Sequence, residues 1–220
     1  MGVPYIHGKY SRFVLKNNAV TSGTVIFTFD DGPGNGLTPA VLDLLDKHNT
    51  RATFFLLGRN IAGNEQIVKE TFKRGHEICS HGFEHLHYWK VSPLKAVRDI
   101  KRGWQAIDTS LEHSRGKYPF RPPYGKLNII CLLYLWFMRV PIIYWTVDSG
   151  DTGPVDNRDE YKAAKIIGKM NGGIILAHDF KRSNQEQENF TLNSIKLALE
   201  EVEKKNLSSM TISELLQTGK

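Results

Sequence analysis

The sequence predicts one α/β domain built on a parallel sheet that is closed or nearly closed into a barrel. Strand-like and helix-like segments alternate along the chain, and the most polar motifs come directly after strand-like runs. In α/β proteins, the carboxyl ends of parallel strands collect the catalytic residues. A chain of 220 residues with 40% apolar residues is long enough for one compact core. We therefore expect a single domain with about seven parallel strands.

The strand predictions depend on short runs of β-branched and aromatic residues that end at turn residues. The run at 24–29 is the clearest, because Asp-Gly-Pro follows it and stops it. The expected strands are 24–29, 52–56, 76–79, 118–120, 141–147, 173–177 and 209–212.

Between these strands, apolar residues recur every three or four positions, which is the helical period. We expect the first helix to have Thr38 as its N-cap and Pro39 at its first helical position, and Gly75 to follow the end of the second. The expected helices cover about 39–45, 61–73, 93–111, 128–138, 159–170 and 192–204.

The predicted helix at 128–138 has no polar face, which is unusual for the outer layer of an α/β protein. Its unbroken apolar run covers only 129–138 before Arg139 and Pro141 interrupt it, whereas a membrane-spanning helix needs about 20 residues. Three alternatives remain open: the helix packs on a partner, lies on a membrane surface, or is covered by the N-terminal twenty residues.

Charge and targeting signals limit the function classes. The net charge of +6 favours anionic polymers or membrane surfaces, but it is spread along the chain. Because no helix-turn-helix, zinc finger or aromatic-interleaved basic strand is visible, we expect no nucleic-acid partner. Residues 1–7 lack the pattern of a signal peptide. This pattern fits a cytoplasmic chain as written, or an exported one if the sequence is truncated, so the compartment stays open.

A metal site is indicated by two histidines that are four residues apart. In a helical turn, His81 and His85 would project from the same face. A third ligand from the acidic pair Asp30–Asp31 would complete a two-His-one-carboxylate set with an open position for water. Such a set fits Zn²⁺, but also Fe²⁺, Co²⁺ or Mn²⁺. His87 could replace either histidine.

Five motifs in order resemble those of the polysaccharide deacetylases, the NodB-homology group also called carbohydrate esterase family 4. They are TFDDGP at 28–33, His-x₃-His at 81–85, RPPYG at 121–125, VDSGD at 147–151 and LAH at 176–178. The resemblance spans about 24–215. It implies a distorted (β/α) barrel, metal-dependent hydrolysis of acetyl groups on sugars, and a catalytic domain at 24–220 that follows an N-terminal extension at 1–23.

The resemblance also implies roles for individual residues. It assigns the metal to Asp31, His81 and His85, with Zn²⁺ expected and Co²⁺, Fe²⁺, Ni²⁺ or Mn²⁺ as alternatives. The general base would be Asp30, which takes a proton from the attacking water and pairs with Arg121. The general acid would be His178, oriented by Asp148. The oxyanion donor would be the backbone N–H of Tyr124.

Two positions depart from the family pattern. The family usually has Ser or Thr where this chain has Gly82, which removes a possible hydrogen bond behind the metal ligands. It usually has an aromatic residue where this chain has Thr152, which puts substrate preference in doubt.

The sequence therefore predicts a monomeric N-deacetylase that acts on a GlcNAc-containing glycan such as peptidoglycan, chitin or poly-GlcNAc. The alternatives are a hydrolase of another amide or ester, such as a lipid-linked amino sugar, and a catalytically silent sugar-binding relative.

Overall fold

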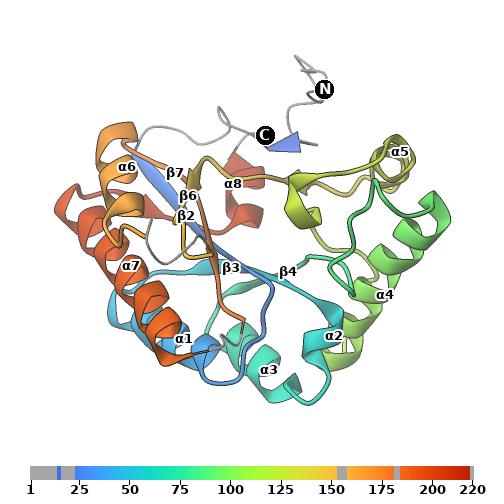
Figure 1. Ribbon diagram of the computed structural model, residues 1–220, viewed down its shortest axis with the longest axis horizontal. Coiled ribbons are helices and arrows are strands. Elements are labelled where there is room, and N and C mark those ends of the chain that lie inside the picture. The colour runs from blue at the N-terminus through green and yellow to red at the C-terminus, as the bar shows by residue number, and fades with distance from the viewer. Residues whose placement is uncertain (1–13, 16–22, 153–157, 181–183, 219–220) are drawn as a thin grey trace.

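The computed structural model describes residues 14–15, 23–152, 158–180 and 184–218, and strands and helices alternate along most of this length (Figure 1). The elements, with the 3₁₀ turn η1, are β1 (Val14–Leu15), β2 (Thr24–Asp30), α1 (Leu37–Lys47), β3 (Ala52–Leu56), α2 (Gly58–Ile61), α3 (Glu65–Lys73), β4 (Glu77–Ser80), α4 (Pro93–Leu111), η1 (Pro123–Gly125), α5 (Ile129–Phe137), β5 (Ile142–Ile143), β6 (Val147–Asp148), α6 (Lys162–Met170), β7 (Gly173–His178), α7 (Gln185–Lys204), β8 (Ser208–Ser209) and α8 (Ile212–Thr218).

The sheet has the strand order β4-β3-β2-β7-β6, and β8 also pairs with β2. All strand pairs in the described part of the chain are parallel. Phe120 bridges Ser80 at the end of β4 to Ile142 of β5, and β5 pairs with β1. These bridges extend the sheet beyond β4 and confirm the predicted α/β architecture in a single domain.

The central strands are buried because helices cover the outside of the curved sheet (Figure 1). Every residue of β2 and β3 is buried, which is why both read as continuous apolar or β-branched runs. The long helix α4 begins as expected, with the Ser92 side chain accepting a hydrogen bond from the Lys95 N–H and Pro93 in the first turn. Its apolar face contributes Trp104 to the core.

Some boundaries differ from the prediction. The helix expected at 61–73 begins only at Glu65, as α3. The short helix α2 precedes it and ends at Ile61, and Gly63, with a φ of +81°, lies between the two. The strand expected at 141–147 is divided into β5 and β6. The first helix begins earlier than expected, at Leu37, so Thr38 lies inside it and is not its cap. The Thr38 hydroxyl donates instead to the carboxylate of Asp179.

Helix α5 has the predicted apolar character. The Asn128 side chain caps it by accepting a hydrogen bond from the Cys131 N–H, and Ile129, Leu133 and Phe137 are exposed. No helix in the described ranges is both long enough and apolar enough to cross a membrane. Contact of α5 with a membrane or a partner stays a prediction, and the N-terminal residues that could cover it lie almost entirely outside the described part.

Candidate metal and acid–base site

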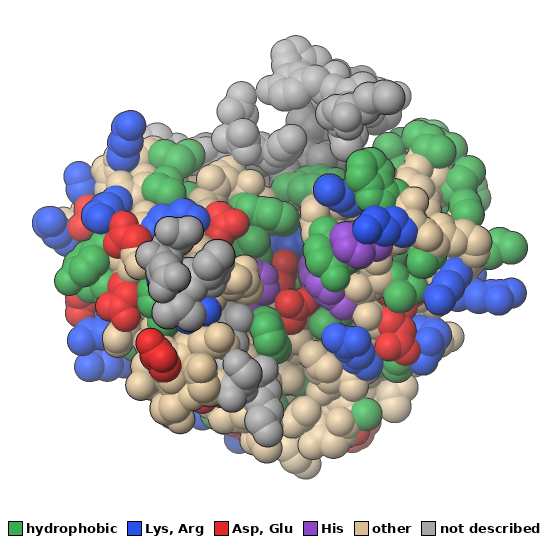
Figure 2. All heavy atoms as spheres, viewed as in Figure 1, with side chains coloured by type: hydrophobic (Ala, Val, Ile, Leu, Met, Phe, Trp, Pro, Cys, Tyr) green, Lys and Arg blue, Asp and Glu red, His purple; other side chains and the backbone are tan. Residues whose placement is uncertain are grey.

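The candidate site lies at the carboxyl ends of neighbouring strands. β2 ends at Asp30, His81 follows the last residue of β4, and β7 ends at His178. Arg121 follows Phe120, which bridges β4 to β5. Because parallel strands end at one edge of a sheet, residues that are far apart in the sequence meet there. Histidine and acidic side chains gather near the centre of the face shown in Figure 2.

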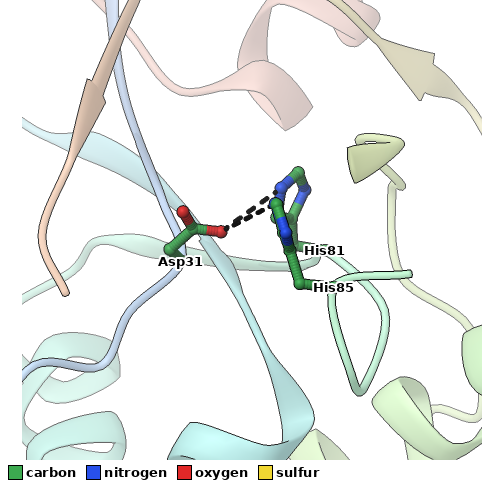
Figure 3. A group of neighbouring side chains, drawn as sticks. All are labelled: Asp31, His81 and His85. Carbon is green, nitrogen blue, oxygen red and sulfur yellow. Dashed lines mark ion pairs between the residues drawn. The ribbon is translucent and has the colours of Figure 1, made fainter. Parts of the chain in front are cut away.

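Asp31, His81 and His85 point toward one another (Figure 3). Asp31 Oδ1 lies 3.5 Å from His81 Nε2 and 3.4 Å from His85 Nε2. One ligand atom from each of the three residues falls within 4.8 Å of the others. The predicted metal-ligand set is therefore brought together by the fold.

The donor atoms of this group suit a divalent metal. Asp31 Oδ1 is buried and has no hydrogen-bond partner among the described residues. His81 Nδ1 lies 2.7 Å from the carbonyl oxygen of Arg121, to which an Nδ1–H can donate, and this tautomer leaves the Nε2 lone pair facing Asp31. Burial lowers the pKa of His81 to about 3, so the imidazole is neutral at pH 7, as a metal ligand must be.

The histidine segment is an irregular loop, so the expected helical turn is wrong. His85 has a φ of +57°, and this backbone turn brings its ring centroid to 5.2 Å from that of His81. His87 does not join the three metal-ligand candidates. Its ring stacks on Tyr124 with centroids 3.6 Å apart and an interplanar angle of 3°.

Asp30 forms a buried ion pair with Arg121. Arg121 Nη1 lies 2.7 Å from Asp30 Oδ1, and the same nitrogen donates to the hydroxyl of Thr28. The guanidinium also donates to the carbonyl oxygens of Ile143 and Tyr144, which fixes its plane. Burial raises the pKa of Asp30 above its ordinary value, and Arg121 opposes that rise. The carboxylate is thus held in one orientation with a higher proton affinity than an exposed aspartate.

The carboxylate beside His178 belongs to Asp151, so the assignment of this role to Asp148 is wrong. Asp151 Oδ1 lies 2.8 Å from His178 Nδ1, and Asp151 Oδ2 accepts the backbone N–H of the same histidine. Asp148 is 49% exposed and lies near Lys162. The reason is local: Gly150 has a φ of +77°, and the turn that it forms directs the second aspartate of the motif inward.

The Asp151 pair changes the proton affinity of His178. Burial lowers the pKa of the imidazole, but the carboxylates of Asp151, Asp30 and Asp31 together outweigh burial and raise the pKa to about 9. Because Nδ1 faces Asp151, Nε2 is the ring nitrogen left for a substrate. The site therefore holds a positively charged proton donor near the Asp30 carboxylate.

Tyr124 is at the edge of the site in a left-handed backbone conformation, with a φ of +57°. It lies in η1, where two prolines precede it and Gly125 follows. Its half-exposed ring lies 4.5 Å from the His85 ring, measured between centroids. The loop predicted to supply the oxyanion donor is thus adjacent to the candidate metal ligands.

Asp179 was not predicted as a site residue, yet it supports the turn that carries Asp30 and Asp31. Its N–H donates to the carbonyl oxygen of Asp30, and its Oδ2 accepts the Thr38 hydroxyl at 2.7 Å. A Cβ at Gly32 would lie 2.4 Å from Asp179 Oδ1, so only glycine fits there. The only sequence signal was that Asp179 directly follows His178.

The chain is similar in sequence to known deacetylases. The sequence profile named polysaccharide deacetylase matches residues 17–135. A peptidoglycan-N-acetylglucosamine deacetylase from Listeria monocytogenes, PgdA, is 32% identical over 214 residues, which cover 92% of this chain but 41% of that protein. A chitooligosaccharide deacetylase from a Bradyrhizobium species is 29% identical over 168 residues, 76% of each chain.

A solved structure extends the likeness to three dimensions. A family 4 carbohydrate esterase from Streptomyces lividans, in complex with acetate, superposes with a TM-score of 0.74 at 30% identity, covering 90% of this chain and 95% of that one. The chain spans less than half of the length of the Listeria relative. The profile match covers more than half of this chain and includes the Asp31, His81 and His85 group. The chain therefore belongs to the polysaccharide deacetylase family.

Proposed function

We propose that this chain hydrolyses the N-acetyl groups of a GlcNAc-containing glycan in a reaction that depends on a divalent metal. The observation that carries the proposal is the meeting of three groups at one strand edge. These groups are the Asp31–His81–His85 set, a carboxylate held by Arg121, and an imidazole held by Asp151. Amide hydrolysis needs an activated water, a base and an acid, and each group suits one of these needs.

The metal would be held by Asp31, His81 and His85, and we propose Zn²⁺ because two imidazoles and one carboxylate are a common ligand set for it. Co²⁺, Fe²⁺, Ni²⁺ or Mn²⁺ fit the same donors. When bound, the metal lowers the pKa of a water molecule and polarises the acetyl carbonyl.

The proposed base is the anion of one ion pair, and the proposed acid is the cation of another. Asp30 accepts the proton of the attacking water, while Arg121 keeps the carboxylate oriented. His178 donates its Nε2 proton to the departing amine, and Asp151 holds Nδ1 so that the ring keeps this orientation. The backbone N–H of Tyr124 donates to the oxyanion, a contribution typically worth about 10²- to 10³-fold in rate.

The proposed substrate class is inferred from the names of the similar proteins. One is named for peptidoglycan N-acetylglucosamine and another for chitooligosaccharides, so the N-acetylglucosamine unit is what these two substrates share. We propose that this unit is also recognised here. A lipid-linked amino sugar, another amide or ester, and a silent sugar-binding role are the alternatives that the experiment must separate.

The experiment compares acetate release from three substrates by the purified, metal-loaded chain. The substrates are chito-oligosaccharides, isolated peptidoglycan and O-acetylated xylo-oligosaccharides. Release from one or both of the GlcNAc substrates, with little from xylan, supports the proposal. Release from the O-acetylated xylo-oligosaccharides alone would show that the chain is an O-acetyl esterase and contradict the proposal. No release from any of them, by folded protein that binds metal, would move the assignment to another amide or to sugar binding.

A further inference from the structure

Asp99 of α4 is a buried carboxylate whose hydrogen bonds, within the part of the chain that the structure describes, all come from the loop carrying the candidate metal-ligand histidines. It is 3% exposed. Asp99 Oδ2 accepts the backbone N–H of Phe83 at 3.0 Å and the hydroxyl of Tyr88 at 2.7 Å. Asp99 Oδ1 accepts the backbone N–H of Glu84 at 3.0 Å. These donors lie on both sides of His85 in the sequence.

We propose that Asp99 is a positioning residue for the metal site and that Tyr88 and Gly82 form one unit with it. Asp99, Tyr88 and Gly82 together form the Asp99 clamp. An irregular loop has no hydrogen-bond ladder of its own, so its backbone N–H groups need other acceptors. By accepting these groups, Asp99 fixes the loop conformation in which His85 faces Asp31. The proposal rests on the metal-dependent function proposed above.

Gly82 shows why the three residues depend on one another. It has a φ of +86°, a conformation that favours glycine. A Cβ at this position would lie 2.3 Å from the Tyr88 hydroxyl and 2.7 Å from Asp99 Oδ2. The clamp therefore fills the space that a side chain at position 82 would need. The Ser or Thr expected at this position from the family pattern would therefore not fit beside Tyr88 and Asp99 in this chain.

Tyr88 is suited to be a permanent member of the clamp. Its side chain is fully buried, and burial raises the pKa of its hydroxyl well above the ordinary value, so the hydroxyl keeps its proton and donates to Asp99. The Tyr88 ring also stacks against the ring of Phe120, the residue before Arg121, with ring centroids 5.9 Å apart. The clamp thus links the histidine loop to the segment that carries Phe120 and Arg121.

A matched control lies on the same helix. Asp108 also accepts two backbone N–H groups, from Arg115 and Gly116, and its Oδ1 accepts the Tyr118 hydroxyl at 2.6 Å. The loop that it holds, 112–117, carries none of the candidate site residues. Tyr88→Phe and Tyr118→Phe therefore each remove a tyrosine–aspartate hydrogen bond from a similar cluster. The Tyr88 cluster holds the loop of the candidate metal ligands, and the Tyr118 cluster does not.

The test measures metal affinity and apoprotein stability for the full chain. Metal is removed from each variant, Co²⁺ is titrated back while its absorption is followed, and Zn²⁺ affinity is measured against a chromophoric chelator. Loss of a partner behind a metal ligand typically weakens metal affinity about 10- to 100-fold. We expect a loss of about 10-fold for Tyr88→Phe and none for Tyr118→Phe, with similar changes in the melting temperature of the two apoproteins.

A second pair of variants tests the coupling, and also serves if Tyr88→Phe folds poorly. Gly82→Ala should weaken metal affinity because its Cβ meets the Tyr88 hydroxyl. In the Gly82→Ala/Tyr88→Phe double variant, the contact with the Tyr88 hydroxyl is absent. The fold-loss of metal affinity in the double variant should therefore be smaller than the product of the fold-losses in the two single variants.

The outcomes separate this proposal from the proposed function. Unchanged metal affinity in Tyr88→Phe, or equal losses in Tyr88→Phe and Tyr118→Phe, would show that the clamp is only structural while leaving the deacetylase intact. A wild-type chain that binds no metal would overturn the metal site and the clamp's role together. A wild-type chain that binds metal but releases no acetate would contradict the proposed deacetylase function and leave the clamp's role in metal binding standing.

Discussion

Asp30 and His178 are register partners on the adjacent parallel strands β2 and β7. Both are the last residues of their strands, so the proposed base and acid are set side by side by sheet pairing rather than by a loop. Each then gains an oppositely charged neighbour, Arg121 for Asp30 and Asp151 for His178. This relationship leads to predictions that treat the two ion pairs separately.

Replacement of Asp30 should stop turnover without removing the metal. Asn at this position has a similar shape but cannot accept a proton, and a positioned base typically contributes about 10²- to 10⁴-fold. We expect Asp30→Asn to lose activity on that scale and to retain the wild-type metal content, measured by elemental analysis after gel filtration. Loss of the metal in this variant would mean that Asp30 is a ligand and that its assignment as the base is wrong.

The two aspartates of the fourth motif should behave differently. Asp151→Asn removes the negative charge beside His178, so we expect kcat to fall by about 100-fold or more. Asp148→Asn changes an exposed carboxylate that lies 3.8 Å from Lys162, so its kcat should stay within about twofold of wild type. Steady-state kinetics on one substrate distinguishes them. A reversed order of the two effects would restore the role first assigned to Asp148.

The pH dependence of kcat should reflect the His178–Asp151 pair. Against the effect of burial, Asp151 with Asp30 and Asp31 raises the pKa of His178 to about 9, so the proton donor is present at neutral pH and activity should fall as pH rises through about 9. In Asp151→Asn, burial still lowers the pKa of His178 and only the carboxylates of Asp30 and Asp31 oppose it, so the alkaline limb should move to lower pH. A limb at the same pH in both proteins would assign it to another group.

The same pair should affect stability. The folded-state pKa of His178, about 9, lies above the ordinary value of 6.5. The contribution of the pair to the free energy of unfolding is therefore complete below about pH 6.5 and is lost as pH rises through about 9. Thermal unfolding from pH 6 to 10 should show this loss in the wild type, and a smaller one in Asp151→Asn.

Removal of the metal should lower the melting temperature. A ligand that binds only the folded state at about 100 times its Kd stabilises that state by about 2.7 kcal/mol, which corresponds to roughly 5–11 °C for a chain of this size. We expect EDTA to lower the midpoint by this amount and Zn²⁺ to restore it. Asp31→Ala should not respond to either treatment. An equal response of Asp31→Ala would place the metal elsewhere.

The sequence was sufficient for features that depend on local pattern. The strand at 52–56 was predicted at its observed bounds, because an uninterrupted apolar and β-branched run leaves few alternatives. The metal ligands were found for a different reason. Their spacing and order follow the motifs of a family, and the sheet then brings Asp31 within reach of His81 and His85.

Other features depend on backbone turns that the residue types do not determine. Whether Asp148 or Asp151 faces His178 is decided by the positive φ of Gly150, and both aspartates stand in the same motif. Residue type and spacing do not distinguish His87 from the two candidate ligand histidines, whereas its stacking on Tyr124 does. Asp99 lies 14 residues after His85 in an ordinary amphipathic helix, so nothing in the pattern linked it to the histidine loop.

The measurement that tests the central claim most directly follows acetate and free amine together during incubation with chito-oligosaccharides. The protein is assayed after EDTA treatment and again after Zn²⁺ or Co²⁺ is restored, with Asp30→Asn assayed in parallel. We predict equal amounts of acetate and amine from the metal-restored wild type, and neither product from the EDTA-treated protein or the variant. Product formation that is unchanged by EDTA, or equal in wild type and Asp30→Asn, would contradict a metal-dependent deacetylase that uses Asp30 as its base.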